Sequence, residues 1–310
     1  MKAVQIAQYG GPEVIEISSN APMPEIKDNQ VLVEVHAASL NPVDWKLRNG
    51  SMKKAVKKAF PLILGGDFAG IVVRAGREVT DLKPGDQVFG NAFLLNGSSG
   101  SLAEFAACNR ESMHLKPDIY FYEAAALPLT GTSALQALTE QIQLREGQKI
   151  LIHGGAGGIG SMAIQLARAM GARVATTVSK KDKDLVKSLG ADKVINYKKE
   201  KFEEEIGDYD AVLDTVGGDT YRRSFRVLKE GGVINSMLED PDERLAGEHN
   251  VRALYQKTVV NAKRLSRLSE YIGGGKLKPL IDREFELDNI REAFEYFETE
   301  HSRGKVIIKT

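Results

Sequence analysis

The sequence contains a single cysteine, Cys108, so no disulfide can form within the chain. One thiol also excludes a zinc site built from several cysteines. Neither charge is in excess, because Lys plus Arg and Asp plus Glu each total 42, and nothing here indicates a nucleic-acid or membrane partner. No apolar run approaches the length of a membrane helix, and the first residues lack the apolar core of a signal peptide. These absences predict a soluble protein of a reducing compartment, the cytoplasm by default.

What the sequence does contain is typical of a globular protein with two domains. The 310 residues exceed the usual size of one domain, and 42% hydrophobic with 27% charged residues is an ordinary balance. Residues 1–121 carry short β-rich runs between turn signals, which predicts a barrel-like all-β domain. The basic segment 52–60 within it is expected to form a solvated helix face, with a mobile lid as the alternative.

A glycine-dense turn dominates the second half of the chain. It lies between a short apolar strand and an amphipathic helix, and a second strand follows at 173–178. Its G-x-G-x-x-G pattern alone also fits a glycine-rich hairpin, but the strand–turn–helix–strand context is that of a dinucleotide site. Glycines there allow a tight turn, close approach of a pyrophosphate and close helix packing, with the anion at the helix N-terminus. The expected contacts are Gly155, Gly157, Gly158, Ile159 and Gly160.

The residues around this turn predict a parallel sheet with helices on both faces. From residue 123 to about 257, helical and strand patterns alternate, with strands at 193–196, 211–214 and 233–236. A final strand at 305–309 follows after the sheet is already complete. We therefore expect this last strand to rejoin the first domain.

The end of the second strand indicates which dinucleotide is bound. An NAD-preferring protein normally has Asp or Glu there, about 20 residues after the glycines, to hold the ribose 2′-hydroxyl. Here the corner reads Ser179, Lys180, Lys181, and the first acid is Asp182, followed by Lys183. A hydroxyl and ammonium groups attract a 2′-phosphate, so the sequence predicts NADPH. A solvated lysine turn is the alternative.

Taken together, the motifs resemble the medium-chain dehydrogenase/reductase superfamily, in particular its zinc-free quinone oxidoreductase and enone (alkenal) reductase branch. The resemblance covers essentially the whole chain. It is carried by LNPVDWKLRNG (40–50), LILGGDFAGIVVRAG (62–76), LKPGDQVFG (82–90), AALPLTGTSALQAL (125–138), HGGAGGIG (153–160), LGADKVINY (189–197), DTVGG (214–218) and RGKVIIK (303–309).

The resemblance implies an α/β protein with a GroES-like β-barrel catalytic domain and a doubly wound Rossmann domain. The expected bounds are 1–121 plus 258–310 for the GroES-like part and 122–257 for the Rossmann part, and members are commonly homodimers or homotetramers. Zinc alcohol dehydrogenases of this superfamily have a Cys and a Gly-His-Glu where this chain has Asn41 to Asp44 and Gly65 to Asp67. No metal is therefore expected, and oxidation of simple alcohols is disfavoured.

The resemblance also implies which residues contact the cofactor beyond the glycine turn. Ser179, Lys181 and Tyr197 match 2′-phosphate contacts, and Lys183 is a second candidate. Thr130 matches a residue beside the nicotinamide.

The resemblance also implies three catalytic residues, all within the segment 41–46. Asn41 matches a residue beside the nicotinamide, and Asp44 and Lys46 match positions that line the substrate side. Lys46 is the charged candidate to stabilise an oxyanion; neutralising Asp44 at the surface is its alternative role. Trp45 stands where the quinone-reductase branch more often has a smaller or phenolic residue, which affects the shape of the pocket.

The function expected from all of this is hydride transfer from NADPH to a quinone or to the C=C bond of an α,β-unsaturated carbonyl. Two alternatives stay open. A 2-enoyl thioester reductase belongs to the same superfamily, and a low-turnover NADPH-binding protein, like the lens crystallins among its relatives, needs no substrate at all.

Overall fold

The computed structural model describes residues 1–56, 59–300 and 302–310 and divides the chain into two compact units. Unit 1 comprises Met1–Leu129, Val260–Gly273 and Pro279–Thr310, and unit 2 comprises Thr130–Val259 and Gly274–Lys278. The boundaries expected from sequence were at 121/122 and 257/258. The short helix α2 (Phe121–Ala125) packs on strands β3 and β5 of unit 1, so unit 1 extends past residue 121.

Unit 1 is built from two β-sheets, and helices pack on their strands. The larger sheet has seven strands in the order β15-β16-β3-β5-β6-β8, with β7 paired to β3, and the smaller has the order β2-β1-β4. The central strands β3 and β5 of the larger sheet are buried along most of their length. The strands are β1 (Ala3–Ile6), β2 (Ile15–Ser18), β3 (Gln30–Ser39), β4 (Leu62–Ile63), β5 (Asp67–Ala75), β6 (Gln87–Asn91), β7 (Phe105–Asn109), β8 (Met113–Leu115), β15 (Ile281–Glu286) and β16 (Lys305–Lys309).

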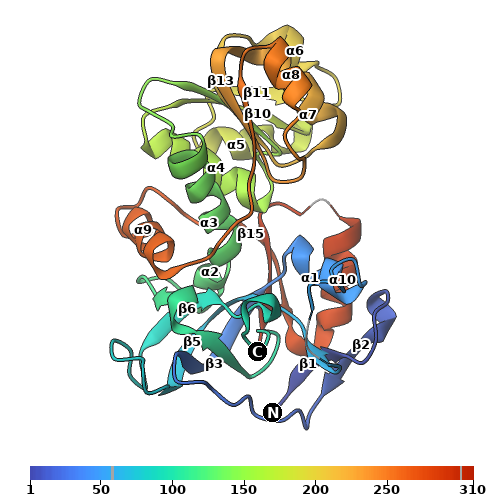
Figure 1. Ribbon diagram of the computed structural model, residues 1–310, viewed down its shortest axis with the longest axis vertical. Coiled ribbons are helices and arrows are strands. Elements are labelled where there is room, and N and C mark those ends of the chain that lie inside the picture. Colours follow the sequence, from blue (N-terminus) through green and yellow to red (C-terminus); the bar gives the residue numbers. More distant parts are fainter. Residues whose placement is uncertain (57–58, 301) are drawn as a thin grey trace. The chain divides into compact units, whose positions relative to one another are not determined.

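The last strand of the chain does rejoin the first part, as predicted. Strand β16 pairs antiparallel with β3, matching Ile307 with Ser39 and Lys309 with Ala37 (Figure 1, red beside blue). The helices of unit 1 are α1 (Pro42–Arg48), α2, α9 (Ala262–Gly273) and α10 (Ile290–Thr299). One expectation was wrong: Lys53 and Lys54 lie exposed in turns and not on a helix, and Lys57 and Lys58 lie outside the described residues.

Unit 2 is a six-stranded sheet in the order β11-β10-β9-β12-β13-β14, and every strand pair in it is parallel. Numbered within the unit, this order is 3-2-1-4-5-6, so the predicted doubly wound sheet is confirmed. Such sheets bind ligands at the carboxyl ends of the strands where the winding reverses, here between β9 and β12. The strands are β9 (Lys149–His153), β10 (Arg173–Val178), β11 (Lys193–Asn196), β12 (Tyr209–Asp214), β13 (Leu228–Ser236) and β14 (Arg252–Tyr255).

Helices cover the sheet of unit 2 because each strand returns through a crossover to the next parallel strand. The expected helix over 134–141 begins earlier, at Pro128, and its last turn widens into a π-helix, Ala137–Gln141. The helices are α3 (Pro128–Gln136), α4 (Gly158–Ala169), α5 (Lys183–Ser188), α6 (Phe202–Glu205), α7 (Gly218–Ser224) and α8 (Glu243–Glu248).

Candidate functional site

The glycine turn of unit 2 lies between the end of β9 and the start of α4, at the place where a doubly wound sheet binds its ligand. Two of its glycines are required by packing inside the protein. A Cβ on Gly155 would lie 2.1 Å from Oγ1 of Thr176, and a Cβ on Gly160 would lie 2.2 Å from the carbonyl oxygen of Gly154. Neither neighbour can move far, because one is backbone and the other is a buried strand residue. Any side chain at these positions would push β9, β10 and α4 apart.

The middle glycine is different. A Cβ on Gly157 would meet only the Gly154 carbonyl at 3.3 Å, so the space beyond Gly157 is open. Gly157 is also the N-cap of the 12-residue helix α4, and it has no side chain to occupy the amides of the first turn. Open space beside helix N-terminal amides suits an anion that approaches the backbone closely, as a pyrophosphate does. Gly158 and Ile159, the first two helical residues, are partly exposed there.

His153 lies directly under this turn and is structural. Its ring is fully buried, with Nδ1 3.0 Å from Oγ1 of Thr177 and Nε2 2.9 Å from Oγ of Ser224. Burial lowers the pKa of His153 to about 4, so the ring is neutral at ordinary pH. A neutral imidazole between two hydroxyls fixes the end of β9 and the turn above it.

Asp214 organises the neighbouring loops and was not singled out from the sequence. Its carboxylate accepts hydrogen bonds from the amides of Val216 and Gly217 and from Oγ of Ser236, at 3.0, 2.9 and 2.7 Å. Oγ of Ser236 in turn accepts from the amides of residues 238 and 239. The loops after β12 and β13 are therefore held together at the carboxyl edge of the sheet. The motif DTVGG (214–218) contains Asp214 and could have indicated it, but nothing in the sequence indicates that Ser236 on the next strand is its partner.

The predicted 2′-phosphate residues gather at the corner after β10. Strands β10 and β11 are paired so that Val178 faces Asn196, and the amide of Tyr197 donates to the carbonyl of Val178 at 3.3 Å. This register brings Tyr197 beside Ser179, although 18 positions separate them in the chain. Lys181 and Lys183 are exposed at the same corner, at the start of α5. Ser179, however, already donates its hydroxyl to Oδ2 of Asp182 at 2.5 Å.

Thr130, the other predicted cofactor residue of unit 2, lies in the first turns of α3 and is only 6% exposed. The same helix contributes Ser133, whose Oγ is 2.8 Å from Oγ1 of Thr258. Gln256 ties these segments together, because its Nε2 donates to the carbonyl of Ser133 at 3.0 Å. The start of α3 is thus fixed to the end of β14 by buried polar contacts.

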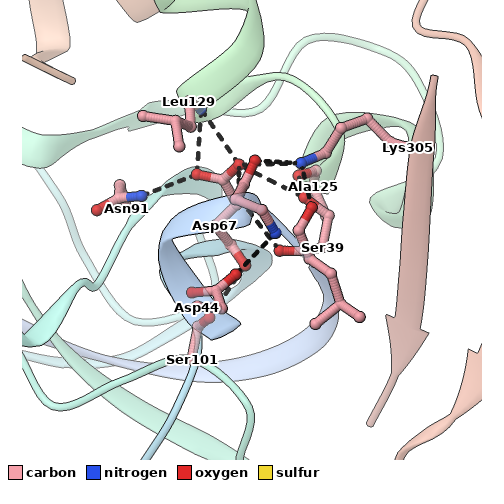
Figure 2. Close-up of polar contacts among 10 residues, drawn as sticks. Ser39, Asp44, Asp67, Asn91, Ser101, Ala125, Leu129 and Lys305 are labelled. Atoms are coloured by element: carbon pink, nitrogen blue, oxygen red, sulfur yellow. Dashed lines mark hydrogen bonds and ion pairs between the residues drawn. The ribbon is translucent and has the colours of Figure 1, made fainter. Parts of the chain in front are cut away.

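Two of the three predicted catalytic residues, Asn41 and Asp44, belong to a buried polar cluster in unit 1 that is centred on Asp67 (Figure 2). The Asp67 carboxylate accepts from Nδ2 of Asn41 at 2.9 Å, from Nδ2 of Asn91 at 2.8 Å and from the amide of Leu129 at 3.1 and 3.2 Å. Lys305 Nζ forms an ion pair with it at 3.7 Å. Segments from β5, β6, α1, β16 and the residues before unit 2 therefore meet at one side chain.

Lys305 brings a positive charge into this cluster, where two carboxyls lie near it. Its Nζ donates to Oδ1 of Asn41 at 2.5 Å and to the carbonyl of Leu40 at 2.7 Å. The second carboxyl belongs to Asp44, whose Oδ2 accepts from the amide of Asn41 at 2.8 Å. Among the described residues, Oδ1 of Asp44 has no hydrogen-bond partner. Asp44, Asp67 and Lys305 are all buried, so the cluster carries a net negative charge unless one carboxyl is protonated.

Burial and the neighbouring charges shift the pKa of all three groups. Burial raises the pKa of Asp44 to about 7, and the neighbouring Asp67 carboxyl adds to the rise. Burial raises the pKa of Asp67 as well, but Lys305 and the Asn41 amide oppose this effect. Burial lowers the pKa of Lys305, whereas both carboxyls act to keep it charged. The hydrogen bonds favour Asp67 as the ionised partner of Lys305, because its oxygens accept from several N–H groups, whereas Oδ1 of Asp44 has no hydrogen-bond partner among the described residues. Asp44 is therefore the carboxyl that holds a proton below about pH 7.

This geometry changes how the predicted catalytic residues are interpreted. Asn41 is 1% exposed and uses both ends of its amide inside the cluster, while Asp44 is fully buried. Both form the capping box that begins α1, so their part in a reaction would be indirect. Lys46 is different, because it is partly exposed and its Nζ lies 5.7 Å from the ring centre of Trp45.

Comparisons with known proteins bear directly on these two sites. Residues 27–118 match the alcohol dehydrogenase GroES-like domain, and residues 189–308 match the zinc-binding dehydrogenase family. A 2-methylene-furan-3-one reductase of Solanum lycopersicum is 40% identical over 99% of this chain and 79% of its own length. An NADPH-dependent alkenal/one oxidoreductase, chloroplastic, of Arabidopsis thaliana is also 40% identical, with the same coverage.

The chain belongs to the medium-chain dehydrogenase/reductase superfamily. Within it, these relatives place the chain in the zinc-free quinone and enone reductase branch, as the sequence motifs predicted. The solved quinone oxidoreductase of Coxiella burnetii has a TM-score of 0.92 to this structure, is 39% identical, and covers 100% of this chain and 99% of its own. The expected GroES-like and Rossmann architecture is therefore confirmed.

The metal-binding pattern of the zinc members of this superfamily is absent from the described residues. In the ranges 1–56, 59–300 and 302–310, no group of three or more His, Cys, Asp or Glu side chains is arranged to hold a metal ion. Asp67 stands where the zinc members have the Glu of their Gly-His-Glu motif, and here its carboxylate is bound by amides and by Lys305.

Proposed function

We propose that this protein transfers a hydride from NADPH to the C=C bond of an α,β-unsaturated carbonyl, or to a quinone. The supporting observation is the combination of the open glycine cradle at Gly157 with whole-chain relatives named for these reactions. The relatives named above reduce, by their names, a 2-methylene-furan-3-one, an alkenal or enone, and a quinone. A conjugated acceptor already accepts hydride well, which suits a protein without a Lewis acid from zinc.

The preference for NADPH over NADH is a finer part of this proposal. Lys181 and Lys183 are exposed beside Tyr197 at the end of β10, where a 2′-phosphate would lie. Charge-assisted hydrogen bonds contribute about 1.5–3 kcal/mol each. One such bond from Lys181 would favour NADPH by about 10- to 100-fold, because about 1.4 kcal/mol corresponds to a factor of ten.

The chain's own residues would bind and orient the reactants. When bound, NADPH supplies the hydride. The amides of the first turn of α4 would hold its pyrophosphate, and the loops joined by Asp214 and Ser236 would border its nicotinamide end. Lys46 is the charged candidate to stabilise negative charge on the substrate oxygen, because a partly exposed ammonium can approach it.

The test is NADPH consumption by the purified protein with a simple quinone and a conjugated enone offered in parallel. We expect turnover with at least one, and the faster acceptor identifies the branch. A 2-enoyl thioester should be offered as the third acceptor, because a thioester reductase would consume NADPH only there. Tight NADPH binding without turnover on any acceptor would instead support the low-turnover binding protein.

We further propose a homodimer or homotetramer located in the cytoplasm. None of the helices in the described part of the chain is both long and apolar enough to cross a membrane. Relatives named chloroplastic and mitochondrial exist, so location needs its own experiment. Light scattering of the purified protein and imaging of the tagged full chain test these two statements.

A further inference from the structure

The corner after β10 combines two opposing signals for the choice of dinucleotide. Lys181 and Lys183 favour a 2′-phosphate, but a carboxylate lies at the same place. Asp182 is only 6% exposed, and its Oδ2 accepts the hydroxyl of Ser179 at 2.5 Å. Ser179 is the residue immediately after β10, which is where an NAD-preferring sheet carries its acid.

Local backbone geometry brings Asp182 to this position. Lys180–Asp182 forms a single 3-10 turn, in which the amide of Asp182 donates to the carbonyl of Ser179 at 3.1 Å. The turn folds the Asp182 side chain back onto Ser179. An acid three positions too late in the sequence is thereby placed at the end of the strand. Linear spacing hides it.

The hydrogen-bond inventory of these two side chains determines what they can bind. A serine hydroxyl has one proton to donate, and an ionised carboxylate can only accept. While the Ser179 proton points at Asp182, its Oγ presents lone pairs to any further ligand. A phosphate, which also only accepts, gains nothing from such an oxygen and is repelled by the carboxylate. A ribose 2′-hydroxyl can donate to either of them.

We propose that Asp182 is a specificity-determining residue that keeps the Ser179 hydroxyl from the 2′-phosphate and allows the chain to bind NADH as well as NADPH. This inference rests on the proposed function, because it concerns the same dinucleotide site. The lysines still favour NADPH, and Asp182 reduces that preference. Ser179 then becomes a phosphate contact only when Asp182 is removed.

The direct experiment is calorimetric binding of NADPH and NADH to the full-length Asp182→Asn protein. The expected result is an increase of about tenfold in the ratio of the NADH to the NADPH dissociation constants, the size of one lost like-charge contact near a surface. Asp184→Asn is the matched control, since Asp184 is an exposed acid on α5 two positions away. It removes the same charge without touching Ser179, and its ratio should change less than about twofold.

A second variant keeps the inference testable should Asp182→Asn not fold. Ser179→Ala in the otherwise unchanged chain should weaken binding of 2′,5′-ADP by less than about twofold, because its hydroxyl is already used. In the Asp182→Asn background the same change should cost about five- to tenfold. A large loss of 2′,5′-ADP affinity for Ser179→Ala in the unchanged background would overturn the inference. So would equal ratios of the NADH to the NADPH dissociation constants for Asp182→Asn and Asp184→Asn. If the unchanged protein binds neither dinucleotide, the proposed function itself fails.

Discussion

Two groups of lysine and aspartate residues in this molecule have different surroundings, and the surroundings give them different roles. In unit 1, Lys305 faces Asp67 and Asp44 with every one of the three buried. In unit 2, Lys181 and Lys183 are exposed beside Asp182 at the end of β10. The buried ammonium is fully occupied by protein oxygens, so it holds segments together. The exposed ammonium groups keep access to solvent, and for that reason they can bind a ligand.

The comparison shows why counting charged residues does not identify a site. Removing one partner of a buried pair leaves the other desolvated and unpaired, which costs much stability. Removing an exposed charge costs almost no stability and changes only what the surface attracts. Four experiments test this difference, in order of expected effect.

The largest effect is expected for Lys305→Met. Losing the ammonium leaves the Asp67 carboxyl buried without its counter-charge, so the free energy of unfolding should fall by about 3–5 kcal/mol. Urea denaturation measures it. Lys309→Met is the matched control on the same strand, because Lys309 pairs with Glu284 at 2.5 Å but has a 43% exposed side chain. It should cost less than about 1 kcal/mol. Equal losses for the two variants would contradict the comparison.

The second experiment concerns the proton on Asp44. The folded-state pKa of Asp44 is raised from 3.8 to about 7, so the folded protein holds this proton more tightly than the unfolded chain. Its contribution to stability is fully present below about pH 4 and is lost as the pH rises through about 7. Between pH 5 and pH 8 this loss amounts to roughly 2–3 kcal/mol at about 1.36 kcal/mol per pKa unit.

Asp44→Asn should remove that pH dependence. An asparagine oxygen can still accept from the Asn41 amide, but it has no proton to release. Urea midpoints of the variant at pH 5 and pH 8 should therefore differ less than those of the unchanged protein. If the midpoints of the variant at pH 5 and pH 8 differ as much as those of the unchanged protein, Asp44 does not carry the proton.

The third experiment is Lys181→Ala, which should affect binding and not stability. The dissociation constant and KM for NADPH should rise by about 10- to 100-fold, whereas those for NADH should change little. The free energy of unfolding, measured by urea denaturation, should change by less than about 0.5 kcal/mol. Lys187→Ala is the control, because Lys187 is an exposed lysine on the following helix α5, and it should leave the binding of both dinucleotides unaffected. Equal losses for NADPH and NADH would remove Lys181 from the 2′-phosphate site.

The smallest effect should come from salt. Exposed charges are screened over about 10 Å at 0.1 M ionic strength and over about 3 Å at 1 M. NADPH binding should therefore weaken severalfold between low and high salt, more than NADH binding. The stability difference between the unchanged protein and Lys305→Met should not change, since buried pairs are screened much less. A salt-dependent difference there would mean that water reaches the cluster.

Local signals in the sequence predicted several strands well. The strands at 173–178 and 193–196 and the final strand at 305–309 were predicted with the bounds that the structure shows. Each lies in a short segment with strong apolar character next to glycine or a charged turn. The glycine pattern also needed only neighbouring residues, because a strand, a turn and a helix that follow one another must pack together.

The buried cluster could not be predicted in the same way. Lys305 and Asn41 are 264 positions apart, and nothing in either segment indicates that they touch. Asp67 was read only as a missing metal ligand, and Asp44 as a surface residue of the substrate side. The Ser179–Asp182 contact is local, yet it depends on one 3-10 turn that the run of lysines did not indicate.

The place of Lys305 in the chain has a consequence for biosynthesis. All residues of unit 2 precede it, whereas most of the strands that surround Asp67 are made before unit 2 begins. Most strands of the larger sheet of unit 1 therefore leave the ribosome long before strand β16 and its Lys305 do. Domains usually mature in the order of synthesis. Here the middle of the chain can fold first, whereas the first sheet is complete only after β16 supplies the ammonium that pairs with Asp67.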